Sequence, residues 1–153
     1  MSTIENASSP IDRIANQYVA AAAALNPIEA TQIGVAGHDH ELPDYSPDGH
    51  AARFELDQDT ARALTAAAEA AGLAAGDRVT VAAMRDRLGL QSELFQAGEH
   101  LADLNVVASP IQAIRDVFDL MPTATAADWE VVAERLAGIP AALAGYGESL
   151  RRG

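Results

Sequence analysis

The sequence lacks cysteine altogether, which excludes disulfide bonds, thiolate metal sites and a cysteine nucleophile. Aromatic residues make up only 5% of the chain, so any core must consist mainly of small aliphatic side chains. Long hydrophobic runs are also missing, because the longest, from Val19 to Leu25, is far too short to span a bilayer. No basic residue precedes an apolar run near the start, so we expect no signal peptide and a cytoplasmic protein.

Positive charge is scarce as well. The chain has 10 Lys and Arg residues against 22 Asp and Glu residues, which gives a formal net charge of −12. Such a surface repels nucleic-acid phosphates and anionic lipid headgroups, so we expect neither nucleic acid nor a membrane as a partner. Solubility is the simplest interpretation of this charge, and an acidic surface for a basic partner is the alternative.

Helix signals dominate what is present. Hydrophobic residues make up 49% of the chain, many of them alanine, and they recur at helical spacing. Serine–proline pairs at 9–10, 46–47 and 109–110 are typical of helix starts. The pattern predicts an all-α fold of about seven helices in an irregular antiparallel helical bundle, with no β-sheet.

The predicted domain boundaries follow from these signals. Residues 1–9 are expected to be a disordered tail, and residues 10–153 a single helical domain that forms the N-terminal part of a larger protein. The predicted helices cover residues 10–25, 27–35, 48–71, 77–103 and 110–121, with a sixth after Thr125 and a seventh from about Pro140.

Three expectations concern packing. Leu90 and Leu94 mark the apolar side of the predicted helix 77–103. Residues 104–108 are expected to be an extended, buried connector. Trp129 and Tyr146 are expected to lie in the helix core, with stacking on a ligand as the alternative.

Residues 36–47 form the clearest loop. Together with His50, the loop residues His38, Asp39, His40, Glu41 and Asp44 form the one polar cluster suited to a divalent metal. His38, His40 and Asp44 are the candidate ligands, because imidazole and carboxylate groups bind zinc. A solvated loop whose Asp and Gly residues serve turns is the simpler interpretation.

His40-Glu41 also begins a His-Glu-x-x-His pattern, in which two histidines one helical turn apart bind zinc. The fourth position after His40 is Asp44, and Pro43 would break the required helix. We therefore expect no zinc helix at this position.

The remaining titratable candidates have structural interpretations. His100 near the end of the predicted helix 77–103 would gain from the helix dipole, with a general base facing a cleft as the alternative. Asp116 and Asp119 could do acid–base work, but a solvated helix face is the simpler interpretation. No P-loop, dinucleotide glycine fingerprint or Gly-x-Ser-x-Gly motif is present, so the residues alone predict no catalytic, cofactor-binding or metal site.

Several segments nevertheless resemble a known family in their order and spacing. The segments are Asn-Pro-Ile-Glu-Ala-Thr (26–31), Leu-Pro-Asp-Tyr-Ser-Pro (42–47), Ala-Gly-Glu-His-Leu (97–101), Asp-Leu-Asn (103–105), Ser-Pro-Ile-Gln-Ala-Ile-Arg-Asp-Val-Phe-Asp-Leu-Met-Pro (109–122) and Ile-Pro-Ala-Ala-Leu (139–143). Together with Gly34 and His38-Asp39 they resemble the N-terminal portion of the bacterial domain-of-unknown-function 885 family, from about residue 10 onward.

The resemblance implies a helical protein of several hundred residues that is similar to zinc metallopeptidases. The family's zinc motif, a His-Glu pair followed by Pro-Gly-His-His, lies far downstream, and nothing in this sequence matches it. The resemblance thus implies a non-catalytic helical scaffold whose partner is the downstream catalytic region of the same protein, with zinc in that parent protein. A stand-alone acidic helical interaction module and a small metal-binding protein are the alternatives.

The end of the sequence fits the scaffold interpretation. The chain stops at Gly153 directly after a predicted helix, so helix faces that would pack on a downstream region are expected to be exposed. Because large exposed apolar patches drive association, we expect a homodimer of the isolated chain.

Zinc titration tests the metal-binding alternative. Because His38 and His40 have no third histidine at helical spacing, we expect calorimetry to detect no zinc binding tighter than about micromolar, which is roughly −8 kcal/mol. Submicromolar binding that disappears in His38→Ala and His40→Ala variants would instead support a small metal-binding protein.

Overall fold

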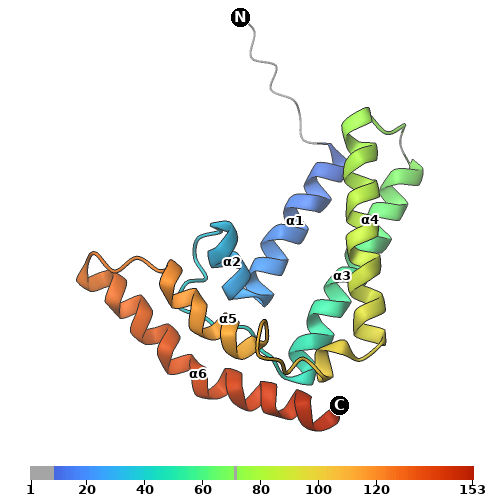
Figure 1. Cartoon of the computed structure of the whole chain (residues 1–153). Helices are drawn as coiled ribbons and strands as arrows, with labels where there is room; N and C mark the ends of the chain where they lie inside the picture. Colours follow the sequence, from blue (N-terminus) through green and yellow to red (C-terminus); the bar gives the residue numbers. More distant parts are fainter. Residues whose placement is uncertain (1–8, 71) are drawn as a thin grey trace, which may run out of the picture.

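The computed structural model describes residues 9–70 and 72–153 (Figure 1). These residues form six α-helices, two 3-10 helices and no strand, which confirms the all-α prediction and reduces the expected seven helices to six. The elements are α1 (Pro10–Leu25), α2 (Pro27–Ile33), α3 (Pro47–Ala70), α4 (Ala75–Gln96), η1 (Glu99–Leu101), α5 (Pro110–Asp116), η2 (Val117–Leu120) and α6 (Ala126–Arg152). Among the described helices, none combines the length and the hydropathy needed to cross a bilayer. The predicted tail lies outside the described residues, except for Ser9.

Side-chain caps fix where three of these helices start. In each cap the side chain three residues ahead accepts the backbone N–H of the cap residue. In α1 and α6 the Ser or Thr side chain also accepts the backbone N–H at that position, whereas in α5 the serine hydroxyl donates to the side chain three residues ahead. The pairs are Ser9 with Asp12 in α1, Ser109 with Gln112 in α5, and Thr125 with Asp128 in α6. The starts predicted from the serine–proline pairs at 9–10 and 109–110 are therefore confirmed, and α3 starts at Pro47 as the pair at 46–47 predicts.

The helices form two arms that meet at an angle (Figure 1). In the first arm α1, α3 and α4 lie side by side, and in the second α2, α5 and η2 lie against α6. Each arm has its own hydrophobic core. The first core centres on Ile11, Leu64, Val81 and Leu88, and the second on Ile28, Ile114, Val117 and Ala142.

Arg135 of α6 is fully buried and ties the second arm together. Its Nε donates to the carbonyl oxygen of Glu41 at 2.9 Å. Its Nη2 donates to the carbonyl oxygens of Pro27 at 3.2 Å and His38 at 3.0 Å, and to the hydroxyl of Thr31 at 2.9 Å. One guanidinium group thus satisfies backbone carbonyls that would otherwise be buried without a hydrogen bond.

The same contacts shape the loop between α2 and α3, which has no regular structure of its own. The Thr31 hydroxyl, which accepts from Arg135, donates in turn to the Asp39 carboxylate at 2.7 Å. Burial lowers the pKa of Arg135, and the carboxylates of Asp39 and Glu41 act in the opposite direction. The predicted loop over residues 36–47 is therefore present and held by a buried charge.

The C-terminal half of α6 approaches the end of this loop very closely. A Cβ on Gly145 would lie 2.8 Å from the backbone nitrogen of Ser46, so only glycine fits there. One turn later, the Ser149 hydroxyl donates to the Tyr45 carbonyl at 2.7 Å. This contact fixes the start of α3 relative to α6.

The predicted helix over residues 77–103 is wrong at its C-terminal end. Gly98 adopts a left-handed φ of 79°, which ends α4 at Gln96 and starts η1. The expected burial of Leu90 and Leu94 is also wrong, since these side chains are 46% and 40% exposed. The buried residues of α4 are instead Val81 and Leu88, which lie in the core that α4 shares with α1 and α3.

Residues 104–108 are not the buried, extended connector that their apolar character predicts. Val106 and Val107 are 92% and 82% exposed. The Asn105 side chain accepts the backbone N–H groups of Val107 at 2.9 Å and Ala108 at 2.7 Å, which turns the chain back on itself. A polar side chain bonding to its own backbone thus outweighs the local hydrophobicity.

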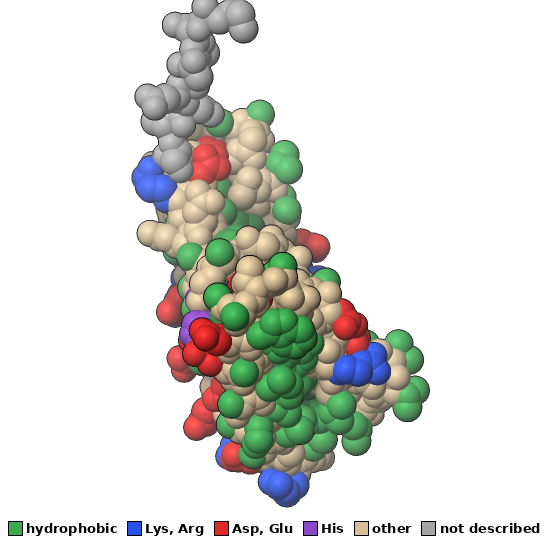
Figure 2. Space-filling view, turned by 90° about the vertical axis from the view of Figure 1, so that its left-hand side faces the viewer, with side chains coloured by type: hydrophobic (Ala, Val, Ile, Leu, Met, Phe, Trp, Pro, Cys, Tyr) green, Lys and Arg blue, Asp and Glu red, His purple; other side chains and the backbone are tan. Residues whose placement is uncertain are grey.

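Trp129 is not in the core, whereas Tyr146 is. Trp129 is 56% exposed and donates its indole N–H to the Thr123 carbonyl at 3.1 Å. Tyr146 is buried and donates its hydroxyl to the Asp103 carbonyl. Figure 2 shows hydrophobic side chains gathered in a strip over the lower half of the molecule, the half that contains α6.

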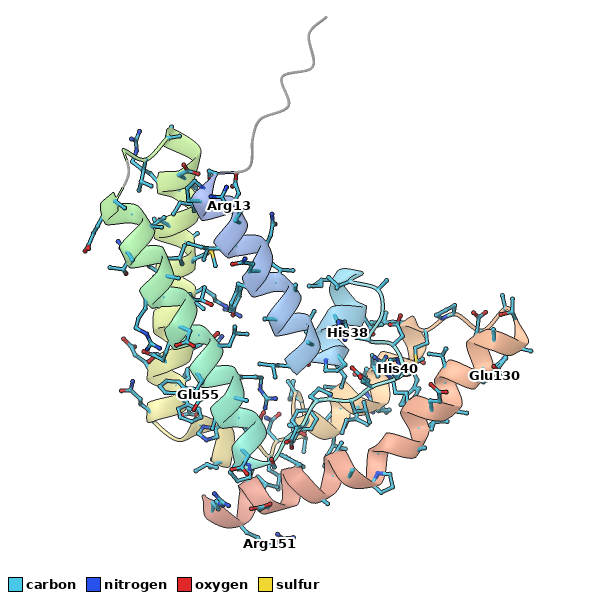
Figure 3. The ribbon with its side chains drawn as sticks, turned by 180° about the vertical axis from the view of Figure 1, so that it is seen from behind. Arg13, His38, His40, Glu55, Glu130 and Arg151 are labelled. Carbon is cyan, nitrogen blue, oxygen red and sulfur yellow. The ribbon has the colours of Figure 1, made fainter. Side chains whose placement is uncertain are left out.

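The two helices expected after Thr125 are one continuous helix. Pro140 lies inside α6, where its missing N–H leaves the Leu136 carbonyl without a helical partner. Pro140 is exposed, so water can satisfy that carbonyl and the helix continues. Figure 3 shows Glu130 and Arg151 at opposite ends of the resulting long helix.

Replacing Arg135 tests its role in the fold. We expect Arg135→Ala to lower the free energy of unfolding by about 3 kcal/mol or more, because it leaves buried carbonyls unpaired. Arg115→Ala is the matched control, since this side chain is 76% exposed, and it should change stability by less than about 0.5 kcal/mol. Urea unfolding followed by circular dichroism measures both, and equal effects of the two variants would contradict the assignment.

Candidate functional site

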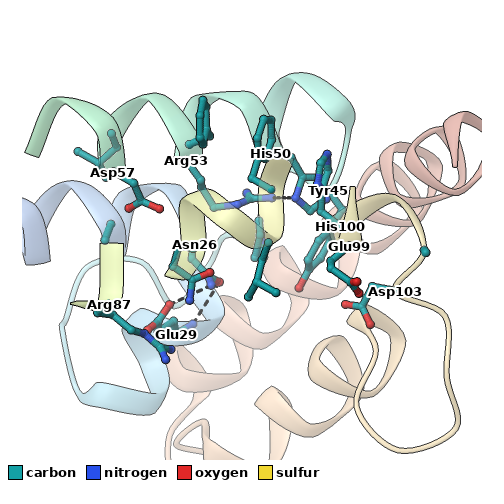
Figure 4. A pocket seen from close by; sticks show the side chains of 18 of the residues that line it. Asn26, Glu29, Tyr45, His50, Arg53, Asp57, Arg87, Glu99, His100 and Asp103 are labelled. Atoms are coloured by element: carbon teal, nitrogen blue, oxygen red, sulfur yellow. Dashed lines mark hydrogen bonds between the residues drawn. The ribbon is translucent and has the colours of Figure 1, made fainter. Parts of the chain in front are cut away.

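A cleft of about 620 Å³ lies where the two arms meet, and we refer to it as the junction cleft (Figure 4). Its lining comes from α1, α2, α3 and α4, from Pro43 and Tyr45, and from residues 99–105. The lining includes the charged or polar side chains of Tyr18, Glu29, His50, Arg53, Asp57, Arg87, Glu99, His100 and Asp103. Side chains distant in sequence therefore converge at one place.

Arg53 and His50 lie one turn apart on α3 and form a fixed pair. The Arg53 Nη1 donates to the carbonyls of Asp44 at 2.9 Å and Leu25 at 3.4 Å. Its Nη2 lies 3.0 Å from the Nδ1 of His50. Because a guanidinium can only donate, Nδ1 of His50 must accept, and the neutral ring carries its proton on Nε2.

The imidazole ring of His50 lies next to that of His100 in η1, and both rings line the cleft. The ring centroids are 4.9 Å apart, and neither the Nε2 of His50 nor the Nδ1 of His100 has a hydrogen-bond partner among the described residues. His100 stacks on Phe95 at 4.4 Å, and Phe95 stacks on Phe54 at 4.2 Å. Four rings thus form a continuous aromatic wall across α3, α4 and η1.

The surroundings of both imidazoles disfavour their charged forms. The pKa of His50 is lowered to about 4, first by burial and then by the nearby charges of Arg53 and His100. The pKa of His100 is lowered by burial and by Arg53. A stabilising helix dipole at His100, as the sequence suggested, is therefore wrong, because η1 is a separate short helix and its environment disfavours the cation.

Asp57 and Asp103 add acidic groups to the cleft lining. The Tyr18 hydroxyl donates to the Asp57 carboxylate at 3.0 Å, and burial raises the pKa of both groups. Burial also raises the pKa of Asp103. These carboxylates are desolvated without a directly bonded cation, so a positively charged ligand group would stabilise their ionised forms.

The three candidate metal ligands of the loop, His38, His40 and Asp44, lie outside the junction cleft. Their side chains do not come together as one set of ligands. His38 Nδ1 and His40 Nε2 approach the two carboxylate oxygens of Glu41 at 3.4 Å and 3.5 Å (Figure 3). Asp44 instead accepts the backbone N–H of Ser46 at 2.8 Å. Across residues 9–70 and 72–153, no three His, Asp or Glu side chains come together as a metal site.

Asp116 and Asp119, the two candidates for acid–base chemistry, lie on the surface. Asp116 pairs with Arg115 at 2.6 Å, and both side chains are more than half exposed. Asp119 is also exposed and does not line the cleft. Their geometry is that of a solvated helix face.

The sequence analysis assigns no role to Arg53 or Asp57, and it considers His50 only as part of the polar cluster for a divalent metal. His50, Arg53 and Asp57 are three and four positions apart, so they share one face of the predicted helix 48–71. That polar face was the available signal. No signal in the sequence predicts that His100 lies close to His50, because this contact depends on how η1 is placed after α4.

Residues 27–153 match the sequence profile of a family described as bacterial protein of unknown function (DUF885). The matched segment contains every cleft residue named above except Tyr18. No curated protein matches the chain.

Acid titration tests the environment of His50. Its pKa is lower in the folded state than its ordinary value of 6.5, so the unfolded chain binds the proton more readily. The free energy of unfolding should therefore fall as the pH drops from about 6.5 to about 4, by about 1–2 kcal/mol for a partly buried ring. Denaturant titrations at several pH values measure this slope. His50→Asn should reduce it, and an identical slope in both proteins would contradict the assignment.

Proposed function

The chain belongs to the bacterial DUF885 family, and on that premise we propose that it is a non-catalytic helical scaffold that forms one wall of a substrate cleft. In this proposal the region downstream of residue 153 in the parent protein is a zinc-metallopeptidase-like hydrolase. The observation that carries the proposal is the junction cleft, whose polar groups are arranged to bind a ligand rather than to react with it.

The positions of these groups support a binding role. Arg53 is held by two carbonyls and orients His50, so both side chains are fixed before a ligand arrives. No Ser or Thr hydroxyl among the described residues bonds to His50 or His100, which a nucleophile–base pair would require. Fixed donors beside an aromatic wall are typical of ligand recognition.

Zinc chemistry requires three protein ligands and one open coordination position. The described residues bring no such set together, so the donor groups of this part of the chain do not fit a catalytic zinc ion. We propose that the catalytic ligands lie in the downstream region that the family resemblance implies. Within this chain we assign no chemical step.

The charge of the cleft suggests which substrates it would favour. Asp57 and Asp103 are desolvated carboxylates on either side of the aromatic wall, and Glu29 adds a further negative charge. Arg53 donates to fixed partners within the protein. A peptide with a positively charged group would thus gain both a charge pair and an aromatic contact.

Hydrolysis assays on two proteins test the proposal. The 153-residue chain should not hydrolyse basic peptides, whereas the product of the complete natural reading frame should. In that product Asp57→Asn should raise KM for basic peptides about tenfold, equal to about 1.4 kcal/mol, and leave kcat nearly unchanged. Asp59→Asn is the matched control, because this exposed residue lies on the same helix outside the cleft.

Two results would overturn the proposal. One is hydrolysis by the 153-residue chain alone. The other is a natural reading frame that ends at Gly153, which would favour the stand-alone acidic interaction module.

A further inference from the structure

The outward face of α6 carries a continuous apolar row, which we call the outer seam. Its residues are Trp129, Ala133, Leu136, Pro140, Leu143, Gly147 and Leu150. Successive members are four or three positions apart, the spacing by which one helix packs along another. The first five are exposed, and the large side chains among them, Trp129, Leu136 and Leu143, are 56%, 48% and 40% exposed.

The outer seam is distinct from the face by which α6 packs on its own molecule. That inner face carries Val132, Arg135, Ala142, Tyr146 and Ser149. These five side chains are buried, whereas the large seam residues Trp129, Leu136 and Leu143 stay exposed. The apolar strip in Figure 2 lies over the half of the molecule that contains α6.

On both sides of Pro140 the side chains of the outer seam follow the same order of sizes, large, small and large. Leu136 and Leu143 flank the centre as large residues, and Ala133 and Gly147 follow as small ones. A large residue closes each end, Trp129 on one side and Leu150 on the other. A twofold axis at Pro140 would set large against large and small against small in two antiparallel copies, which is the self-complementarity of a closed dimer.

Charge at the two ends of α6 matches the same arrangement. Glu130 follows the first seam residue, and Arg151 follows the last (Figure 3). The Arg151 guanidinium lies beside the seam, since a Cβ on Gly147 would be 3.4 Å from its Nη2. In an antiparallel pair Glu130 of each copy would lie near Arg151 of the other, whereas a parallel pair would set like charges together.

From these features we propose that two copies of this chain pair through their outer seams, with antiparallel α6 helices related by a twofold axis near Pro140. Trp129 is preorganised as an anchor, because its hydrogen bond to Thr123 holds the indole at the surface. The net charge of −12 on each copy opposes association, but salt near physiological strength screens charges more than about 8 Å apart. The pairing does not depend on the proposed scaffold function.

Sedimentation over a range of concentrations measures the pairing directly. We expect the wild-type chain to form dimers at micromolar concentration in physiological salt. The double variant Leu136→Glu, Leu143→Glu should be monomeric, because it sets four carboxylates at the twofold axis. Val79→Glu is the matched control, since Val79 is a 69% exposed apolar residue of α4 far from the seam, and it should remain dimeric. Circular dichroism confirms that each variant is helical.

A charge exchange tests the antiparallel register. Glu130→Arg and Arg151→Glu should each weaken the dimer about tenfold, and the double exchange should restore it. A monomeric wild-type chain at about 100 μM, dimers that survive both leucine changes, or a double exchange that fails to restore pairing would each overturn the proposal. Failure here would leave the hydrolysis assays unaffected, so the two proposals can be separated.

Discussion

The buried guanidinium of Arg135 is the interaction on which most of the second arm depends. It replaces water for three backbone carbonyls and one hydroxyl, and these acceptors belong to α2 and to the loop that follows it. A buried charge is costly unless its hydrogen bonds are satisfied, so the loop is confined to conformations that keep these carbonyls in place. Only its Nη1 lacks a partner within the described residues.

This constraint extends to the junction cleft. The loop held by Arg135 ends at Tyr45 and Ser46, where Ser149 and Gly145 of α6 fix it again. From there α3 begins, and its first turns carry His50 and Arg53. The geometry of the cleft therefore depends on α6, although α6 contributes no residue to its lining. The helix thus supports the cleft with one face and leaves another face free for contact.

Local signals in the sequence were enough to predict most of the helices, and distant contacts account for what was missed. Ser9 and Ser109 act within three residues, so their caps could be recognised directly. The sequence predicts a helix start at Pro140, but this proline lies inside α6. It is tolerated there because it is exposed, and its exposure depends on tertiary packing. Arg135 and the His50–His100 contact had no sequence signal, since their partners lie far along the chain.

The separation along the sequence between Arg135 and its hydrogen-bond acceptors has a consequence for biosynthesis. The His38 carbonyl and Arg135 are 97 positions apart, so the loop between α2 and α3 leaves the ribosome long before the residue that fixes it. At about 5–20 residues per second, the interval is roughly 5–20 s. During that time the first arm can form from α1, α3 and α4 alone, while the carbonyls around Arg135 stay hydrated. The nascent chain therefore completes its cleft only after α6 emerges.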